Sequence, residues 1–250
     1  PAQLAMLKSV GKDAFRIRNP ETALATLREA AQLAFTPPCG PVSIEIPIDV
    51  QGMTLPMPSE IAFKPIAPLA PSKEEVLALA KRLQAKKRPL LWLGGGARGA
   101  GPAVKRLVEM GWGVVTSVQG RGILSEDHPS SLASYNLQKP TEAFYQTVDA
   151  LLVVGSRLRS NETLTYQLKL PGNRFRIDAS ALAENRSYSS EYFVQGDALL
   201  TLDALADARQ LRRPHGDAGG AWRAAQRAAH RGLDAQGPVV VDQQRCVLGE

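Results

Sequence analysis

Several short segments of the sequence place glycine, arginine or an acid directly after an apolar run. Gly94-Gly95-Gly96-Ala97-Arg98-Gly99 follows the apolar run 89–93 and fits the pattern G-x-G-x-x-G. Glycines in such a turn let the backbone approach a phosphate, and the dipole of a following helix favours negative charge. The pattern therefore predicts a phosphate-binding turn, and a tight turn that binds nothing is the alternative.

Gly120, Arg157 and Asp178 each lie in a turn at the end of a later apolar run. Guanidinium groups suit diphosphates, and a carboxylate can accept hydrogen bonds from a ribose hydroxyl or an adenine amine. We predict a cofactor groove lined by Gly94, Gly95, Gly96, Arg98, Gly120, Arg157 and Asp178. The alternatives are ordinary surface arginines, and a helix or turn cap at the aspartate.

Short apolar runs alternate with helical patterns between residues 73 and 208, and this order indicates the fold. Continuous apolar strands are typical of a parallel sheet that is covered on both faces. We therefore predict an α/β fold, a doubly wound parallel sheet with helices on both faces, flanked by partial domains. The carboxyl ends of such strands meet at one edge, where ligands bind. The expected strands are 89–93, 113–118, 150–154, 175–177 and 192–194.

A proline-rich stretch indicates where the domains divide, because it has five prolines and no periodic pattern between residues 51 and 71. We expect the end of one domain in 1–52, a linker in 53–72 and a whole domain in 73–208. Residues 209–250 would then hold a second linker, a helix at 221–233 and a strand at 239–241, which resemble the start of a third domain. The chain begins at Pro1 and is expected to be a piece of something longer.

Helix starts are predicted at two places. Asn19 before Pro20 is typical of a helix cap, and Ser72 with Glu75 fits a capping box, in which the serine accepts an N–H and the glutamate reaches back. A strand is expected at 42–46. The expected buried helix faces are Leu24, Leu27, Ala31 and Phe35 in the first helix, and Val76, Leu79, Ala80 and Leu83 in the second.

Composition excludes several classes of protein. With 44% hydrophobic and 22% charged residues, the 250-residue chain is globular. Its two cysteines indicate a reducing compartment and predict a cytoplasmic protein. No apolar run is long enough for a membrane span. The formal charge of +6 comes largely from late arginines without a nucleic-acid motif, so neither a membrane nor a nucleic acid is expected as a partner.

The sequence lacks the residue patterns that several other catalytic and cofactor-binding classes require. The histidines and cysteines show no metal-ligand spacing, and no G-x-S-x-G elbow is present, so no metal site is predicted. A nicotinamide dehydrogenase needs an acid about 20 residues after the glycine turn, where this sequence reads Thr116-Ser117-Val118-Gln119. A stand-alone regulatory module that binds NAD or another nucleotide nevertheless remains the alternative function.

Two parts of the sequence resemble thiamine-diphosphate-dependent enzymes, and the acetolactate synthase branch is the most similar. Gly40–Val50 resembles the end of their pyrimidine-binding domain, and Lys12–Ala34 is similar to the helix before it. Residues 73–208 resemble the Rossmann-like central domain. The segments that carry this resemblance are 88–96, 115–122 followed by 126–129, 149–158, 176–178 and 195–198.

The resemblance implies an enzyme that breaks or forms a carbon–carbon bond next to the carbonyl of a 2-oxo acid. It implies thiamine diphosphate and Mg²⁺, a homodimer or homotetramer, and a central domain that holds FAD, ADP or, as a purely structural domain, nothing. The family binds the diphosphate and metal with a Gly-Asp-Gly…Asn motif, which Gly196-Asp197-Ala198 does not match, and it activates the cofactor with an early glutamate. No catalytic residue or metal ligand is therefore expected in this chain, which should be inactive by itself.

Overall fold

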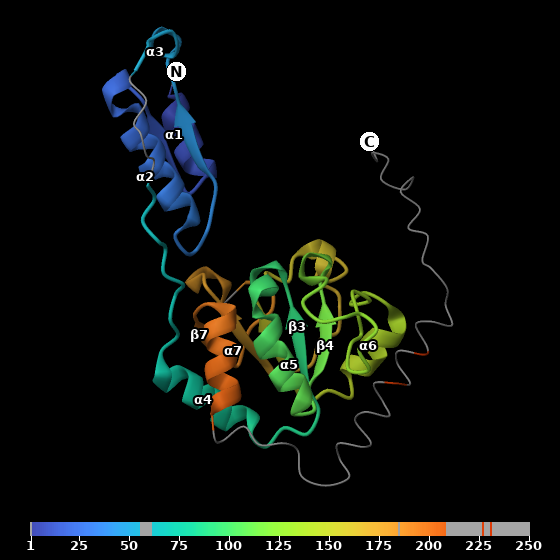
Figure 1. The fold of residues 1–250 in the computed structure, drawn as a ribbon. Helices are drawn as coiled ribbons and strands as arrows, with labels where there is room; N and C mark the ends of the chain where they lie inside the picture. The colour runs from blue at the N-terminus through green and yellow to red at the C-terminus, as the bar shows by residue number, and fades with distance from the viewer. Residues whose placement is uncertain (1, 56–61, 185, 209–226, 228–230, 232–250) are drawn as a thin grey trace, which may run out of the picture. The chain divides into compact units, whose positions relative to one another are not determined.

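The structure, a computed structural model, describes residues 2–55, 62–184, 186–208, 227 and 231 (Figure 1). The chain divides into two compact units, residues 1–69 (unit 1) and 70–250 (unit 2). The linker and strand expected within 209–250 lie outside the described residues. So does most of the helix expected at 221–233, of which residues 227 and 231 are helical.

Unit 1 is a two-stranded parallel sheet with three helices. Its elements are α1 (Gln3–Val10), β1 (Asp13–Arg16), a 3-10 turn η1 (Pro20–Thr22), α2 (Ala23–Phe35), β2 (Val42–Glu45) and α3 (Ile48–Gln51). The expected cap is present, since the Asn19 side chain accepts the N–H of Thr22 at 3.0 Å, but it caps η1 rather than an α-helix. The stretch Lys12–Ala34, which resembles the family's helix, is helical only in its later part, because 13–16 form a strand that pairs with β2.

The helix face predicted to be buried in unit 1 is largely exposed. Leu27 is 40% exposed and Phe35 68% exposed, and the only buried residue of α2 is Ala30. The helix α2 packs on β1 and β2, but two strands offer too little surface to cover its whole apolar side, so Leu27 and Phe35 stay exposed in the described residues.

Unit 2 is built on five parallel strands in the order β4-β3-β5-β6-β7. All five expected strands are present, whereas α6 and the 3-10 turns were not predicted. The elements are α4 (Lys73–Leu83), β3 (Pro89–Leu93), η2 (Gly95–Ala100), α5 (Gly101–Glu109), β4 (Gly113–Thr116), η3 (Val118–Gly120), α6 (Lys139–Tyr145), β5 (Ala150–Val154), η4 (Ser160–Glu162), β6 (Arg174–Asp178), η5 (Ala181–Ala183), β7 (Tyr192–Gln195) and α7 (Ala198–Asp207).

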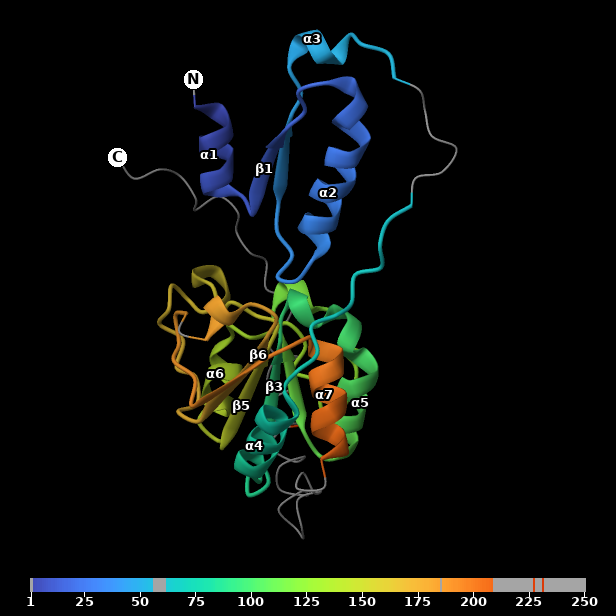
Figure 2. The same ribbon diagram turned by 90° about the vertical axis from the view of Figure 1, so that its left-hand side faces the viewer.

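Both faces of this sheet are covered, which confirms the predicted fold class. Leu91 and Leu93 pack with α4, α5 and α7 in one core, whereas Leu90 and Trp92 pack with α6 in the other. Figure 2 shows the sheet between α6 on one side and α5 with α7 on the other. A strand with two buried faces has no polar alternation, and this is why β3 and β5 read as continuous apolar runs.

The outer edge of β4 is covered by the chain that follows it. Residues 130–133 run parallel to β4, with the N–H of Leu132 donating to the Val114 carbonyl at 2.7 Å and that of Thr116 to the Ala133 carbonyl at 2.9 Å. This short segment satisfies edge groups that would otherwise be open to pairing with another chain.

Capping residues and one ion-pair cluster fix the helices of unit 2. The Ser72 hydroxyl accepts the N–H of Glu75 at 3.3 Å, as predicted. The predicted return contact of the Glu75 side chain is replaced by a hydrogen bond that the Ser72 hydroxyl donates to Glu74 at 3.0 Å. At α7, the Asp197 carboxylate accepts the N–H of Leu200 at 3.0 Å.

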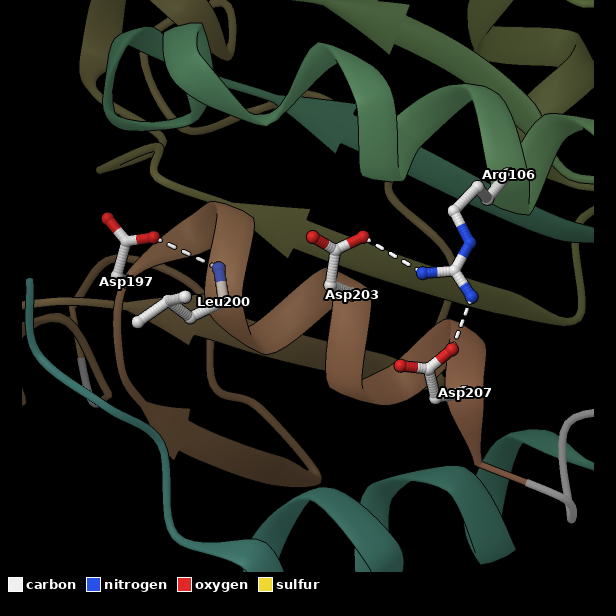
Figure 3. Close-up of polar contacts among 5 residues, drawn as sticks. All are labelled: Arg106, Asp197, Leu200, Asp203 and Asp207. Carbon is white, nitrogen blue, oxygen red and sulfur yellow. Dashed lines mark hydrogen bonds and ion pairs between the residues drawn. The ribbon is translucent and has the colours of Figure 1, made fainter.

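Figure 3 shows Arg106 of α5 between two carboxylates of α7. Its guanidinium bonds Asp203 at 3.0 Å and also bonds Asp207. These contacts join α5 to α7 on the same face of the sheet.

Candidate functional site

The strand order of unit 2 creates a point where the chain changes direction across the sheet. From β3 the chain goes first to the edge strand β4 and then to β5 on the opposite side of β3. The connections that follow β3 and β5 therefore run to opposite sides of the sheet, and ligands of open α/β sheets bind outside the carboxyl ends of the strands at such a point. Every residue predicted to line the groove follows, or ends, one of the strands β3, β4, β5 or β6.

The glycines hold three of these loops in close contact. A Cβ on Gly94 would lie 2.3 Å from the Gly155 carbonyl oxygen, and one on Gly120 would lie 2.1 Å from that of Leu93. Gly155 also has a φ of +58°, a conformation that side chains disfavour. Any other residue at these three positions would force the loops apart.

The amide groups of these glycines already have acceptors inside the protein. Gly94 donates to the Val154 carbonyl at 2.9 Å, Gly96 to that of Gly155 at 3.0 Å, and Gly120 to that of Ser117 at 2.9 Å. The turn after β3 also continues as the 3-10 helix η2 before α5 begins at Gly101. The close loop packing thus explains the G-x-G pattern structurally.

Arg98 connects two of the loops. Its Nε donates to the Gln119 carbonyl at 3.0 Å, and its Nη2 donates to the Gln119 side-chain oxygen at 3.0 Å. The two contacts bring η2 together with the turn after β4, which contains Gln119 and Gly120.

Asp178 ends β6 and is half-buried. Burial raises the pKa of this carboxyl, while the N–H of Ser180 at 2.9 Å and then the charges of Arg176, Arg157 and Arg186 act to lower it. The structure thus brings two of the predicted residues, Arg157 and Asp178, within electrostatic reach of each other. One carboxylate beside three guanidinium groups leaves an excess of positive charge at the carboxyl end of β6.

The sequence interpretation missed two hydroxyl groups at the end of β4. Thr116 is 2% exposed and Ser117 is fully buried, and neither side-chain oxygen has a hydrogen-bond partner among the described residues. Polar residues directly after an apolar strand were the available signal. Buried hydroxyls without partners are costly, which makes them places where a ligand or water can bind.

The loop after β5 is shaped by a serine and a glutamate. The Ser156 hydroxyl donates to Glu162 at 3.1 Å and accepts the N–H of Leu158 at 3.1 Å. Leu158 has a φ of +46° and is fully buried, so these bonds hold a strained backbone in place. These bonds fix the backbone on both sides of Arg157, directly after β5.

Metal ligands and membrane spans were also searched for. Within the described ranges, no three His, Cys, Asp or Glu side chains are grouped so that they could hold a metal ion. No helix of the described residues has the length and apolarity for crossing a membrane. His128 takes part in a turn, where its Nδ1 accepts the N–H of Ser130 at 3.1 Å.

The comparisons with known proteins point to one family. The family model described as "Thiamine pyrophosphate enzyme, central domain" matches residues 76–205. The probable 2-ketoarginine decarboxylase AruI of Pseudomonas aeruginosa is 32% identical over 218 residues, which are 83% of this chain and 38% of that protein. The probable acetolactate synthase large subunit of Methanocaldococcus jannaschii is 28% identical over 218 residues, 81% of this chain and 36% of that protein.

A solved structure shows the same fold. It comes from Mycobacterium smegmatis, is described as a thiamin diphosphate-dependent enzyme, and has a TM-score of 0.67 at 24% identity. The match covers 87% of this chain and 42% of that one. The chain therefore spans well under half the length of the relatives it matches. The family match covers more than half of the chain, and this protein belongs to the thiamine pyrophosphate enzyme family, whose central domain it contains.

Proposed function

We propose that this chain is part of an acetolactate-synthase-like enzyme that uses thiamine diphosphate and Mg²⁺ to break and form carbon–carbon bonds at 2-oxo acids. The match of residues 76–205 to the family's central domain carries this proposal. The relatives named for 2-ketoarginine decarboxylation and acetolactate synthesis support the substrate class. Thiamine diphosphate, when bound, supplies the nucleophilic carbon and the electron sink for this chemistry.

The thiamine cofactor does not fit the described residues of this chain. The aspartate of Gly196-Asp197-Ala198 is used as the cap of α7, where it accepts the N–H of Leu200. No group of acids in the described part could hold the metal. The cofactor and catalytic residues are thus proposed to lie in other parts of the enzyme, and unit 2 serves as a scaffold in a homodimer or homotetramer.

We further propose that the crevice of unit 2 binds the ADP part of FAD or ADP itself. Asp178 fits a ribose or adenine donor, because burial raises its pKa and it accepts a single hydrogen bond in the described structure. Arg157 and the other nearby guanidinium groups fit the diphosphate. Gly94, Gly95, Gly96, Gly120 and Arg98 would line the groove as close-packed backbone and its support rather than as a cradle of free amides.

The reaction is tested with the full-length enzyme that contains this segment. Purified enzyme is incubated with a panel of 2-oxo acids, and CO₂ release is measured with and without thiamine diphosphate and Mg²⁺. We expect turnover of at least one 2-oxo acid that requires both additions. Absence of turnover for every 2-oxo acid with both cofactors present would overturn the proposed reaction.

The groove is tested separately by calorimetry with ADP and by the absorbance of the purified enzyme. A flavin absorbance band at about 450 nm would identify FAD. A colourless enzyme that binds ADP would identify the nucleotide without flavin. A colourless enzyme that also fails to bind ADP would show that the groove is structural, while leaving the reaction untouched.

A further inference from the structure

Arg176 is an arginine in the middle of a buried strand. It belongs to β6 and is 1% exposed. Its neighbours across the sheet are Val153 of β5 and, one strand further, Trp92 of β3, both buried on the face covered by α6. A charged side chain in such an apolar row is unusual and needs an explanation.

The guanidinium group bonds only backbone carbonyls in the described part of the chain. Its Nη1 donates to the Ala183 carbonyl, and its Nη2 donates to the Tyr188 carbonyl at 3.5 Å. Its Nε is buried without a hydrogen-bond partner there. Burial accordingly lowers the pKa of this arginine.

Stability alone does not explain this arrangement. Removing a guanidinium from water is costly, and even buried ion pairs can often be replaced by well-packed apolar side chains with no loss of stability. Both carbonyls that Arg176 bonds lie in the connection between β6 and β7. The same connection carries Arg186, and it begins directly after Asp178.

Asp178 lies two residues after Arg176 and therefore on the same face of the strand. The groups that act on its carboxylate are the N–H of Ser180 and the guanidinium groups of Arg176, Arg157 and Arg186. Among these three arginines, Arg176 alone is buried, so its charge is held in a fixed position near the Asp178 carboxylate.

We propose that Arg176 is a positioning residue for an anionic ligand of the crevice. It holds Ala183 and Tyr188, in the connection between β6 and β7, against the sheet, so that Arg186 and Asp178 are presented to the same ligand, and it supplies positive charge near Asp178. This inference rests on the proposed nucleotide groove, because ADP is the ligand that would meet both groups.

Two substitutions separate the charge of Arg176 from its geometry. Arg176→Met removes both. Arg176→Lys keeps the charge but loses the planar guanidinium group that bonds the carbonyls of Ala183 and Tyr188. Arg174→Met is the matched control, because Arg174 lies at the amino end of the same strand and also bonds backbone carbonyls, those of Pro171 at 2.6 Å and Ser189 at 3.0 Å.

The measurements are calorimetric affinity for ADP, the urea midpoint of unfolding, and a carbon-13 NMR titration of Asp178 in the ligand-free chain. For Arg176→Met we expect about tenfold weaker ADP binding, an unchanged or higher urea midpoint, and a higher pKa for Asp178. For Arg176→Lys we expect about threefold to tenfold weaker binding with the pKa of Asp178 close to that of the wild type. Arg174→Met should bind ADP as the wild type does.

The outcomes distinguish the inference from the proposed function. ADP binding by the wild type and equally by both Arg176 variants would overturn the positioning role and leave the groove intact. A wild type that fails to bind ADP would overturn both, since no ligand would be left to position. If Arg176→Met does not fold, the lysine variant decides, and wild-type affinity in that variant overturns the inference.

Discussion

The two units of this chain use the same kind of parallel strand with very different results. In unit 2 every residue of β3 and β5 is buried, whereas in unit 1 no residue of β2 is. Five strands with helices on both faces bury two continuous cores. Two strands cannot do this, and parallel sheets are stable only when both faces are covered. Sequence patterns that look alike can therefore belong to a self-sufficient fold or to part of one.

Exposed apolar side chains mark the same difference. In unit 1, Ile48 is 87% exposed, Val10 76% and Phe35 68%. The apolar residues buried there are Ala14, Ile17, Ala30 and Val50. Such a surface on so small a unit is typical of one that is covered by further polypeptide. We therefore expect unit 1 to depend on contacts outside the described chain, and unit 2 not to.

The largest expected effect comes from the core of unit 2. Trp92→Ala removes a fully buried side chain, and we expect it to destabilise unit 2 by about 3–5 kcal/mol in urea unfolding followed by circular dichroism. The matched substitution Phe35→Ala in unit 1 should change stability by less than about 0.5 kcal/mol. Similar losses for the two variants would remove the contrast between the units.

The next effect concerns the loops of the crevice. Gly94→Ala puts a Cβ 2.3 Å from the Gly155 carbonyl oxygen, and we expect a loss of about 3 kcal/mol or more from forced separation of the loops. Gly99→Ala is the control, since nothing lies within 4 Å of its Cβ position. Urea midpoints of the two variants check this expectation, and equal midpoints would show that the glycine turn is not closely packed.

A smaller, pH-dependent effect is expected at Asp178. Its pKa is raised in the folded state by burial, so the folded protein holds this proton more tightly than the unfolded chain does. Stability should therefore fall as the pH rises from below the ordinary pKa of an aspartate through the raised one.

The substitution Asp178→Asn removes the titrating carboxyl and with it the loss of stability at higher pH. The asparagine side chain can still accept the N–H of Ser180. The variant should match the wild type in acid and be at least as stable near neutral pH, as measured by urea unfolding across the pH range. A variant that is equally destabilised at every pH would contradict the assignment of burial as the cause.

The smallest expected effect is at the surface cluster of Figure 3. Arg106→Gln removes the ion pairs with Asp203 and Asp207, which are all well exposed to water. We expect a slight decrease in the thermal midpoint that largely disappears at high salt, because exposed pairs are screened. A large loss that persists at high salt would mean that this cluster, and not the cores, joins α5 to α7.

The sequence predicted the fold of unit 2 well because its signals are local and repeated. The strands β3 and β5 are continuous apolar runs, and the cap at Ser72 and the buried face of α4 follow from spacing alone. The strand β1 was missed, since it is defined by pairing with β2 more than 25 residues later. Pairing over such distances leaves little local pattern.

The positions of the candidate site residues in the fold could be predicted from the sequence, whereas their hydrogen bonds and close contacts could not. Strand order alone puts Gly94, Gly120, Arg157 and Asp178 at one edge of the sheet. The use of the glycine amides within the protein could not be read from spacing, because it depends on how closely neighbouring loops approach. The buried Arg176 was also missed, since an arginine within a short apolar run reads as an exposed residue.

Hydrogen exchange of the 250-residue chain, followed by mass spectrometry, tests the difference between the units most directly. We expect amides of β3 and β5 to exchange at least about a hundredfold more slowly than those of β1 and β2, because the former open only with global unfolding of unit 2. Equal protection of the two pairs of strands would contradict the account, because unit 1 would then be as stable without further polypeptide as the central domain.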